Sequence, residues 1–262
     1  MIGLIIGFYS NDFYFSVNRD NRDNNNINNI YIIYIICMIS ILLPIYNGIE
    51  FLDESISSII NQEFTEWELL IGINGHLPNS DVYKIAKKYE EDSNEYGVYG
   101  KIKVYDFSHL RGKSDTLNLL ISFCNYDWIS LMDVDDIWQK NKLQCQVQFM
   151  NDYDVIGTRA IYFGDYLNGV LPAIPYGDIS NHDFHSGNPI INSSCLIRKE
   201  YSFWNKENDG VEDYELWLKL RSEGKRFYNC EEIAVKHRLH FNSAFNTKNH
   251  DEKLERIKNK YP

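Results

Sequence analysis

The chain has 262 residues, a mass of 30.9 kDa, 44% hydrophobic and 15% aromatic residues, and a formal charge of -11. This size and composition predict a globular protein with one large or two closely joined domains. The negative charge argues against general nucleic-acid binding, because phosphate contacts need clustered Lys and Arg. The five cysteines are widely spaced and form no C-x-x-C pair, so they indicate neither a disulfide framework nor a zinc site. They favour a reducing location, in the cytoplasm or on the cytoplasmic face of a membrane.

Residues 1–37 form an N-terminal extension outside the expected main domain. Residues 18–29 are polar and of low complexity, so we interpret them as a flexible linker. The apolar stretch 30–45 is shorter than the ~18 to 20 residues of a membrane span, and its second half suits a buried strand better. Met1–Phe8 lacks the basic flank and cleavage pattern of a signal peptide. Weak membrane association through residues 1–37 stays open as an alternative.

From residue 38 onward, apolar runs alternate with amphipathic segments. We expect strands over 39–44, 67–73, 101–106 and 127–132, and helices over 51–61, 81–92, 113–124 and 137–150. Continuously apolar strands separated by helices predict a mostly parallel, doubly wound α/β sheet that is covered on both faces. Residues 157–189 lack a clear period and indicate loops around a binding cleft. After them we expect a strand over 192–198, a helix from 211 to near 224, an extended stretch over 231–241 and a solvated tail helix beyond 249.

Three carboxylates follow the fourth predicted strand directly, in the run Asp133-Val134-Asp135-Asp136. In an extended segment Asp133 and Asp135 would point the same way, and oxygen ligands of this kind suit Mg²⁺ or Mn²⁺ completed by substrate phosphates. The alternative is that Asp135 or Asp136 caps the following helix. Ligands of doubly wound sheets bind where strands end, which favours a site here. No glycine-rich phosphate loop is present in the sequence, so a nicotinamide or P-loop nucleotide site is disfavoured.

Taken together and in order, these motifs resemble the inverting glycosyltransferases of family 2, which have the GT-A fold. The resemblance covers about residues 38–245 and rests on the segments 39–48, 55–64, 67–71, 131–138 and 212–218 together with Asn118. It implies one GT-A domain over 38–262, composed of a nucleotide-sugar half (38–136), an acceptor half (137–248) and a tail (249–262). The half before 136 would bind the donor, and the half after it the acceptor.

For the donor side, the resemblance implies a nucleotide-sugar lying at the strand exits. It gives Pro44 and Tyr46 contacts to the base and ribose, and it assigns Asn118 to nucleotide-sugar binding. An ordinary strand-ending turn is the alternative for Pro44 and Tyr46. The family carries two acidic residues before a glycine on the second strand, where this chain has Ile73-Asn74. Asn74 can still hydrogen-bond a base edge, and we expect a UDP-linked sugar.

For the cofactor, the resemblance implies Mn²⁺ or Mg²⁺ with Asp135 as the direct ligand. Asp133 would contact the ribose or metal-bound water, and Asp136 would cap the helix after it. His240 lies in a stretch similar to the family's Arg-x-His region, which assigns it to the metal or diphosphate; an ordinary surface or core histidine is the alternative. His237 and His240 would face opposite sides of a strand and would not form one paired site.

The reaction implied is transfer of a hexosyl or N-acetylhexosaminyl group to a hydroxyl of a glycan or other acceptor, with inversion. A metal would neutralise the leaving diphosphate, and a carboxylate on the opposite face would take the acceptor's proton. We expect Asp213 to be this base, with Glu212 orienting it or contacting the acceptor; helix capping by both acids is the alternative. A nucleotidyltransferase is disfavoured because residues 44–48 contain no Lys or Arg. A catalytically silent nucleotide-sugar or glycan-binding module of the same fold stays open.

Overall fold

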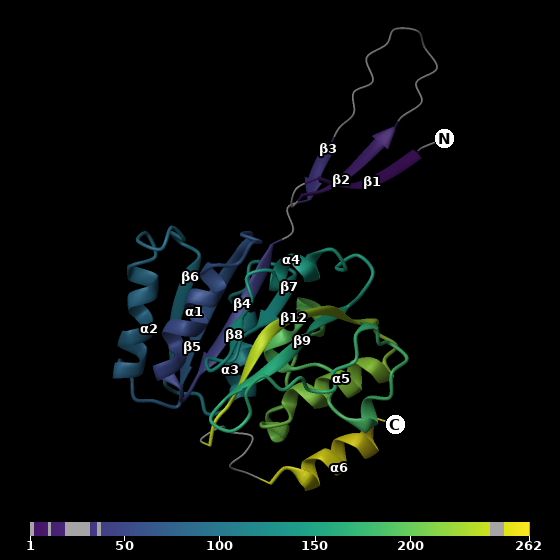
Figure 1. Cartoon of the computed structure of the whole chain (residues 1–262). Coiled ribbons are helices and arrows are strands. Elements are labelled where there is room, and N and C mark those ends of the chain that lie inside the picture. The colour runs from purple at the N-terminus through teal and green to yellow at the C-terminus, as the bar shows by residue number, and fades with distance from the viewer. Residues whose placement is uncertain (1–2, 10–11, 19–31, 36–37, 242–248, 262) are drawn as a thin grey trace. The chain divides into compact units, whose positions relative to one another are not determined.

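The computed structural model describes residues 3–9, 12–18, 32–35, 38–241 and 249–261 (Figure 1). The chain divides into two compact units, residues 1–38 and residues 39–262. The first unit contains a three-stranded antiparallel sheet that the sequence did not predict, in the order β1-β2-β3. Its strands are β1 (Gly3–Tyr9), β2 (Asp12–Asn18) and β3 (Ile32–Ile35). Of the predicted linker over 18–29, all but residue 18 lies outside the described residues.

The second unit begins with the predicted alternation of strands and helices. Four parallel strands lie side by side in the order β7-β4-β5-β6. They are β4 (Ile39–Ile45), β5 (Trp67–Asn74), β6 (Ile102–Phe107) and β7 (Trp128–Leu131), and the helices between them are α1 (Leu52–Ile60), α2 (Asp81–Glu91) and α3 (Lys113–Ile121). All eight residues of β5 are buried, as expected for a central parallel strand with both faces covered.

The residues after β7 extend this sheet to nine strands. Its elements are β8 (Ile137–Trp138), α4 (Lys142–Val147), β9 (Val155–Gly164), β10 (Gly177–Asp178), β11 (Leu196–Arg198), α5 (Glu212–Ser222), β12 (Phe227–Leu239) and α6 (Asp251–Lys260). Short 3₁₀ turns lie at Ile49–Phe51, Phe184–Ser186, Asn192–Ser194, Lys199–Tyr201 and Lys206–Asn208. The sheet order is β10-β12-β9-β11-β7-β4-β5-β6, with β8 paired to β12.

The antiparallel strand β11 determines which strands have their carboxyl ends at the same edge of the sheet. Because β11 runs antiparallel to both β7 and β9, those two strands are parallel to each other, and β12 is parallel to β9. The carboxyl ends of β4, β5, β7, β9 and β12 therefore lie at one edge of the sheet. That edge receives Tyr46, Asn74, Asp133, Asp165 and His240, which follow or end those strands.

Three sequence-based predictions about elements were wrong in detail. The helix expected over 137–150 starts only at Lys142, because Ile137 and Trp138 pair with Lys236 and Val235 of β12. The strand expected from residue 192 begins with a 3₁₀ turn, and β11 starts at residue 196. The tail helix α6 is not simply solvated, since Ile257 is completely buried in the core that includes α5. None of the described helices combines the length and the apolar character needed to span a bilayer.

Candidate functional site

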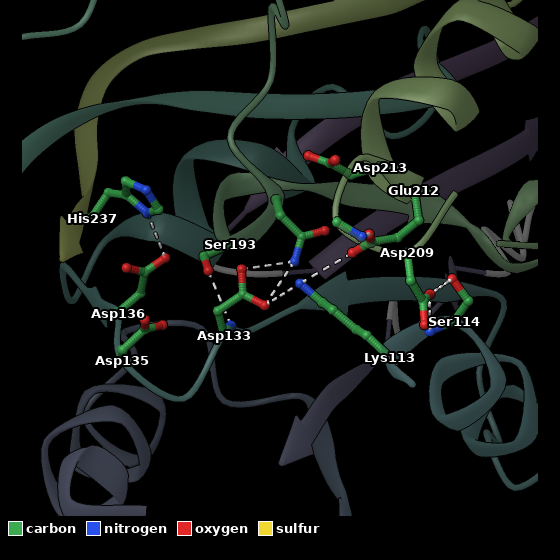
Figure 2. Close-up of polar contacts among 12 residues, drawn as sticks. Lys113, Ser114, Asp133, Asp135, Asp136, Ser193, Asp209, Glu212, Asp213 and His237 are labelled. Carbon is green, nitrogen blue, oxygen red and sulfur yellow. Dashed lines mark hydrogen bonds and ion pairs between the residues drawn. The ribbon is translucent and has the colours of Figure 1, made fainter. Parts of the chain in front are cut away.

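The turn after β7 directs three carboxylates to three different partners, of which Lys113 and His237 are drawn in Figure 2. Asp133 meets Lys113, Asp135 meets His240, and Asp136 meets His237. The prediction that Asp133 and Asp135 share one face of an extended segment was wrong, because β7 ends at Leu131. The residues after it form a turn in which the Asp136 N–H donates to the Asp133 carbonyl at 3.1 Å.

Asp133 is the most densely hydrogen-bonded of the three acids. Lys113 Nζ donates to Asp133 Oδ1 at 2.5 Å, and Asn192 Nδ2 lies 3.0 Å from both carboxylate oxygens. The Asp133 N–H donates to Ser193 Oγ at 3.0 Å. Burial opposes ionisation of Asp133, but the Lys113 charge and the hydrogen bonds from Lys113 and Asn192 outweigh it, so the pKa is lowered. Asp133 is therefore held as a carboxylate facing Lys113.

Asp135 and His240 form the pair that could hold a divalent cation. His240 Nε2 lies 2.9 Å from Asp135 Oδ2, and both side chains are partly buried. Burial, followed by the charges of Asp136 and Asp133, raises the pKa of Asp135 to about 6. A carboxylate destabilised in this way would gain from a positive ion, and a carboxylate oxygen with an imidazole nitrogen suits Mn²⁺. Two protein ligands fit a site whose remaining positions are filled by substrate phosphates and water.

Asp136 is completely buried and anchors the turn to β12, so its predicted role as a helix cap was wrong. It accepts hydrogen bonds from the Arg238 N–H at 2.8 Å and from His237 Nδ1 at 3.0 Å. Burial lowers the pKa of His237, but the Asp136 carboxylate overcomes this and raises it to about 9. Arg238 Nε also donates to the Asp135 carbonyl at 2.7 Å. The two histidines thus contact different acids, as their spacing predicted.

The start of α5 brings two further acids to the same place (Figure 2). Glu212 is buried, and its Oε1 lies 3.5 Å from Lys113 Nζ while its Oε2 accepts from the Gly210 N–H at 2.5 Å. Asp213 Oδ2 accepts from Asn188 Nδ2 at 3.0 Å. Burial, followed by the Glu212 charge, raises the pKa of Asp213 to about 6. Lys113 therefore bridges a carboxylate after β7 and a carboxylate on α5.

The first turn of α3, which carries Lys113, is capped by a side chain from a distant part of the chain. Asp209, which precedes α5, accepts a hydrogen bond from the Ser114 N–H at 3.0 Å and another from the Ser114 hydroxyl. Gly112 has a φ of +102°, and a Cβ there would lie 2.2 Å from Asp209 Oδ2. Only glycine fits this close approach, so Gly112 and Asp209 together fix the first turn of α3.

Tyr46 and Asn74 lie at the exits of β4 and β5. The Tyr46 side chain is exposed, and its ring centroid is 5.5 Å from that of His76. Gly75 has a φ of +77° and passes under Tyr46, where a Cβ would lie 2.5 Å from the ring. Asn74 is buried, and its Nδ2 donates to the Gly112 carbonyl at 3.2 Å. Pro44 lies within β4, half-buried, one residue before the strand ends.

Asn118 has a different setting from the other predicted donor-side residues. Its Nδ2 donates to the Trp204 carbonyl at 2.7 Å, and its Oδ1 accepts from the Trp204 N–H at 3.0 Å. Both ends of the amide are thus engaged with one backbone segment. This pairing fastens α3 to the chain before α5.

Four polar residues of the site escaped the sequence-based prediction: Lys113, Asn188, Asn192 and Asp209. Lys113 did give a signal, because it is a basic residue at the start of a predicted helix that follows a predicted strand. Asn192 gave none, although its Oδ1 is buried and has no hydrogen-bond partner among the described residues.

Comparison with known proteins was informative at the level of family and fold. The sequence pattern of Glycosyl transferase family 2 matches residues 40–205. The chain is 27% identical over 222 residues to the O-antigen biosynthesis glycosyltransferase WbnJ of Escherichia coli, with 79% of this chain and 82% of WbnJ covered. It is 26% identical over 222 residues to the UDP-Glc:alpha-D-GlcNAc-diphosphoundecaprenol beta-1,3-glucosyltransferase WfgD of Escherichia coli, with 80% and 81% covered.

Solved structures show the same fold at lower sequence similarity. The crystal structure of S. aureus TarS 1-349 in complex with UDP-GlcNAc aligns with a TM-score of 0.66 at 15% identity, covering 84% of this chain and 64% of that one. The chain therefore spans less than two thirds of the TarS structure. This likeness confirms the predicted GT-A fold with its mostly parallel sheet.

Proposed function

The chain belongs to glycosyl transferase family 2 and is a glycosyltransferase, and we propose that it transfers a sugar from a nucleotide-sugar to an acceptor hydroxyl with inversion. The observation that carries this proposal is the bridge of Lys113 between Asp133 and Glu212. It joins the acids after β7 to the acids of α5. Donor phosphates and an acceptor base would need this proximity.

On the donor side, Tyr46 offers an exposed aromatic face for the base, with Pro44 beside it at the end of β4. Asn74 retains its Oδ1 as an acceptor for a base edge, since only its Nδ2 is bound to Gly112. Asp133 would accept from the ribose. A uridine donor is supported by WfgD, whose name specifies UDP-Glc, and by TarS, which binds UDP-GlcNAc.

Two cationic groups would face the leaving diphosphate. Asp135 and His240 are the residues that would hold Mn²⁺ or Mg²⁺, which when bound supplies positive charge to the leaving phosphate oxygens. Lys113 supplies a permanent charge from the protein, because Asp133 and Glu212 hold its pKa well above the usual range despite its burial. In binding the diphosphate, Lys113 would exchange part of its contact with these acids for the phosphate oxygens.

Asp213 is the proposed general base. As the acceptor oxygen bonds to the anomeric carbon, the bond from that carbon to the diphosphate oxygen breaks, and Asp213 takes the hydroxyl proton. Its pKa of about 6 makes it a stronger base than an ordinary aspartate while leaving it ionised at neutral pH. Asn188 fixes Oδ2, which leaves Oδ1 for the acceptor, and Glu212 would orient the base through its charge.

The acceptor we propose is a sugar hydroxyl. The name of WfgD specifies an acceptor GlcNAc linked to diphosphoundecaprenol, which supports an acceptor carried on a polyprenyl lipid for this chain as well.

Turnover tests the proposed transfer. The purified chain is screened with UDP- and GDP-sugars for Mn²⁺-dependent thermal stabilisation and for nucleotide release with glycan acceptors. We expect a UDP-sugar to stabilise the protein and Asp213→Asn to bind it without transfer, while Glu223→Gln, an exposed acid at the end of α5, behaves as the wild type. Donor binding by the wild type without transfer to any acceptor would overturn the proposed transfer. No stabilisation by any nucleotide diphosphate, with or without metal, would overturn the proposed nucleotide-sugar donor.

A further inference from the structure

A hairpin turn follows β9 and is held by its own hydrogen bonds. The Tyr162 N–H donates to the Val170 carbonyl at 2.8 Å, and the Gly169 N–H donates to the Tyr162 carbonyl at 2.9 Å. Inside the turn, the Asn168 side chain accepts from the Gly164 N–H and donates to the Gly164 carbonyl, both at 3.0 Å. The residues at its tip are therefore presented by a defined structure.

Large apolar side chains are exposed along this hairpin and the segment after it. They are Tyr166, Leu167, Val170, Leu171 and Tyr176, with exposed fractions of 38 to 56%, and Phe241 at 70% packs its ring 5.4 Å from that of Tyr166. We call these six residues the apolar rim. No charged residue occurs from 166 through 177. Single exposed apolar residues are ordinary, but such a concentration in one uncharged segment indicates a contact surface.

The apolar rim adjoins the proposed active site. The Asp165 N–H donates to the Leu239 carbonyl at 2.8 Å, and the Phe241 N–H donates to Asp165 Oδ2 at 3.2 Å. Residue 240 between them is the histidine that contacts Asp135. The rim therefore begins one residue from the proposed metal ligand, at the edge of the sheet where the strands of the site end.

We propose that the apolar rim docks the enzyme on the surface of the lipid bilayer that carries its acceptor. This inference rests on the proposed function, and specifically on a polyprenyl-linked acceptor. Tyrosine rings beside aliphatic side chains suit the interfacial layer of a bilayer, where one end of the ring is apolar and the other meets water. A segment without charge enters that layer at little desolvation cost.

The charge of the chain also limits what kind of lipid contact is feasible. At -11, the protein is not attracted to anionic headgroups, so binding must come from burial of apolar side chains. Docking would place the proposed active site next to the headgroup layer, which is where the diphosphate and sugar of a lipid-linked acceptor lie. Binding to vesicles should therefore depend on the apolar rim and not on anionic lipids.

The test is flotation of the full-length protein with vesicles of phosphatidylcholine alone. We expect the wild type to float and the double variant Leu167→Asp/Leu171→Asp to bind at least about tenfold more weakly. The matched control is Tyr99→Asp/Phe203→Asp, which changes two exposed aromatic residues near the amino end of β6 and beyond the end of the antiparallel β11, at the opposite edge of the sheet. Adding phosphatidylserine should not strengthen binding.

Several outcomes would overturn the docking proposal. They are no flotation of the wild type, equal flotation of the Leu167→Asp/Leu171→Asp variant, or flotation that requires a second protein. An equal loss of transfer to lipid-free and lipid-linked acceptors would make the rim part of the acceptor pocket instead. Mn²⁺-dependent stabilisation by UDP-sugars, measured on the same variant and expected to be unchanged, reports separately on the proposed function. Its absence from the wild type would reject that function whatever the vesicles show.

Discussion

Replacement of Asp213 by Asn should lower turnover and raise stability at the same time. Removal of a general base costs about 10²- to 10⁴-fold in kcat, which corresponds to about 3 to 5 kcal/mol of transition-state stabilisation. Ionised Asp213 also destabilises the folded protein, because burial and Glu212 raise the pKa of Asp213 from 3.8 to about 6. At 1.36 kcal/mol per pKa unit, ionised Asp213 destabilises the fold by at most about 3 kcal/mol at pH 7, and by less where water screens the side chain.

The sign of this effect varies with pH in a defined way. The pKa of Asp213 is higher in the folded than in the unfolded protein, so the folded state is most stable when Asp213 is protonated. The destabilisation by ionised Asp213 is fully present above pH 6. The stabilisation from Asp213→Asn should therefore be largest near pH 7, fall to about half near pH 5 and vanish below about pH 4. For a domain of this size each kcal/mol corresponds to about 2 to 4 °C in Tm.

The assays are thermal unfolding and the pH profile of kcat for the wild type and two neighbouring variants. Activity of the wild type should fall about tenfold from pH 7 to pH 5, as Asp213 becomes protonated. Glu212→Gln removes a negative neighbour and should move this fall to lower pH, whereas Asn188→Ala removes a hydrogen bond to the carboxylate and should move it to higher pH. A flat profile, or shifts of the same sign in both variants, would refute the assignment of Asp213.

Three other predictions concern neighbouring groups. Lys113→Met should weaken binding of UDP about tenfold or more in titration calorimetry, because a cation facing the diphosphate is lost; Lys84→Met on α2 is the matched control, and equal affinities would exclude the contact. Asp135→Asn should abolish the additional thermal stabilisation that Mn²⁺ gives to the UDP complex, and a retained Mn²⁺ effect would contradict its role as ligand. Asn118→Ala should lower stability by about 1 to 3 kcal/mol in chemical unfolding, since the Trp204 backbone loses both partners, and should leave the affinity for UDP unchanged; a selective loss of affinity would restore it to the donor site.

The parallel half of the fold was predictable because local sequence patterns identify its strands and helices. Within the eight consecutive buried residues of β5, residues 69–73 are a continuous apolar run in the sequence, and Leu52, Ile56 and Ile59 form the buried face of α1 at helical spacing. The sequence did not reveal which strands pair when they lie far apart along the chain. Ile137 and Trp138 look helical by their neighbours, but strand pairing with residues about 100 positions later decides their conformation.

The site was predictable where chemistry is concentrated in adjacent residues, as in Asp133–Asp136 and Glu212-Asp213. The site was not predictable where irregular segments contribute single polar residues to it. Asn192 comes from a 3₁₀ turn, and no local pattern marks it. The buried face of α6 is different, since Leu254, Ile257 and Tyr261 recur at helical spacing and so mark this face in the sequence itself.

The cap on α3 has a consequence for how the chain is made. Asp209 follows Ser114 by 95 residues, and Lys253 of α6 donates to the Asp209 carbonyl at 2.8 Å. During synthesis from the N-terminus, the parallel strands up to β7 emerge long before the residue that completes the first turn of α3. Until then Lys113 has neither that cap nor Glu212. A nascent or truncated chain ending near residue 136 would carry most of the proposed donor-side residues without the groups that orient them, so binding competence should come only after Glu212 has been made.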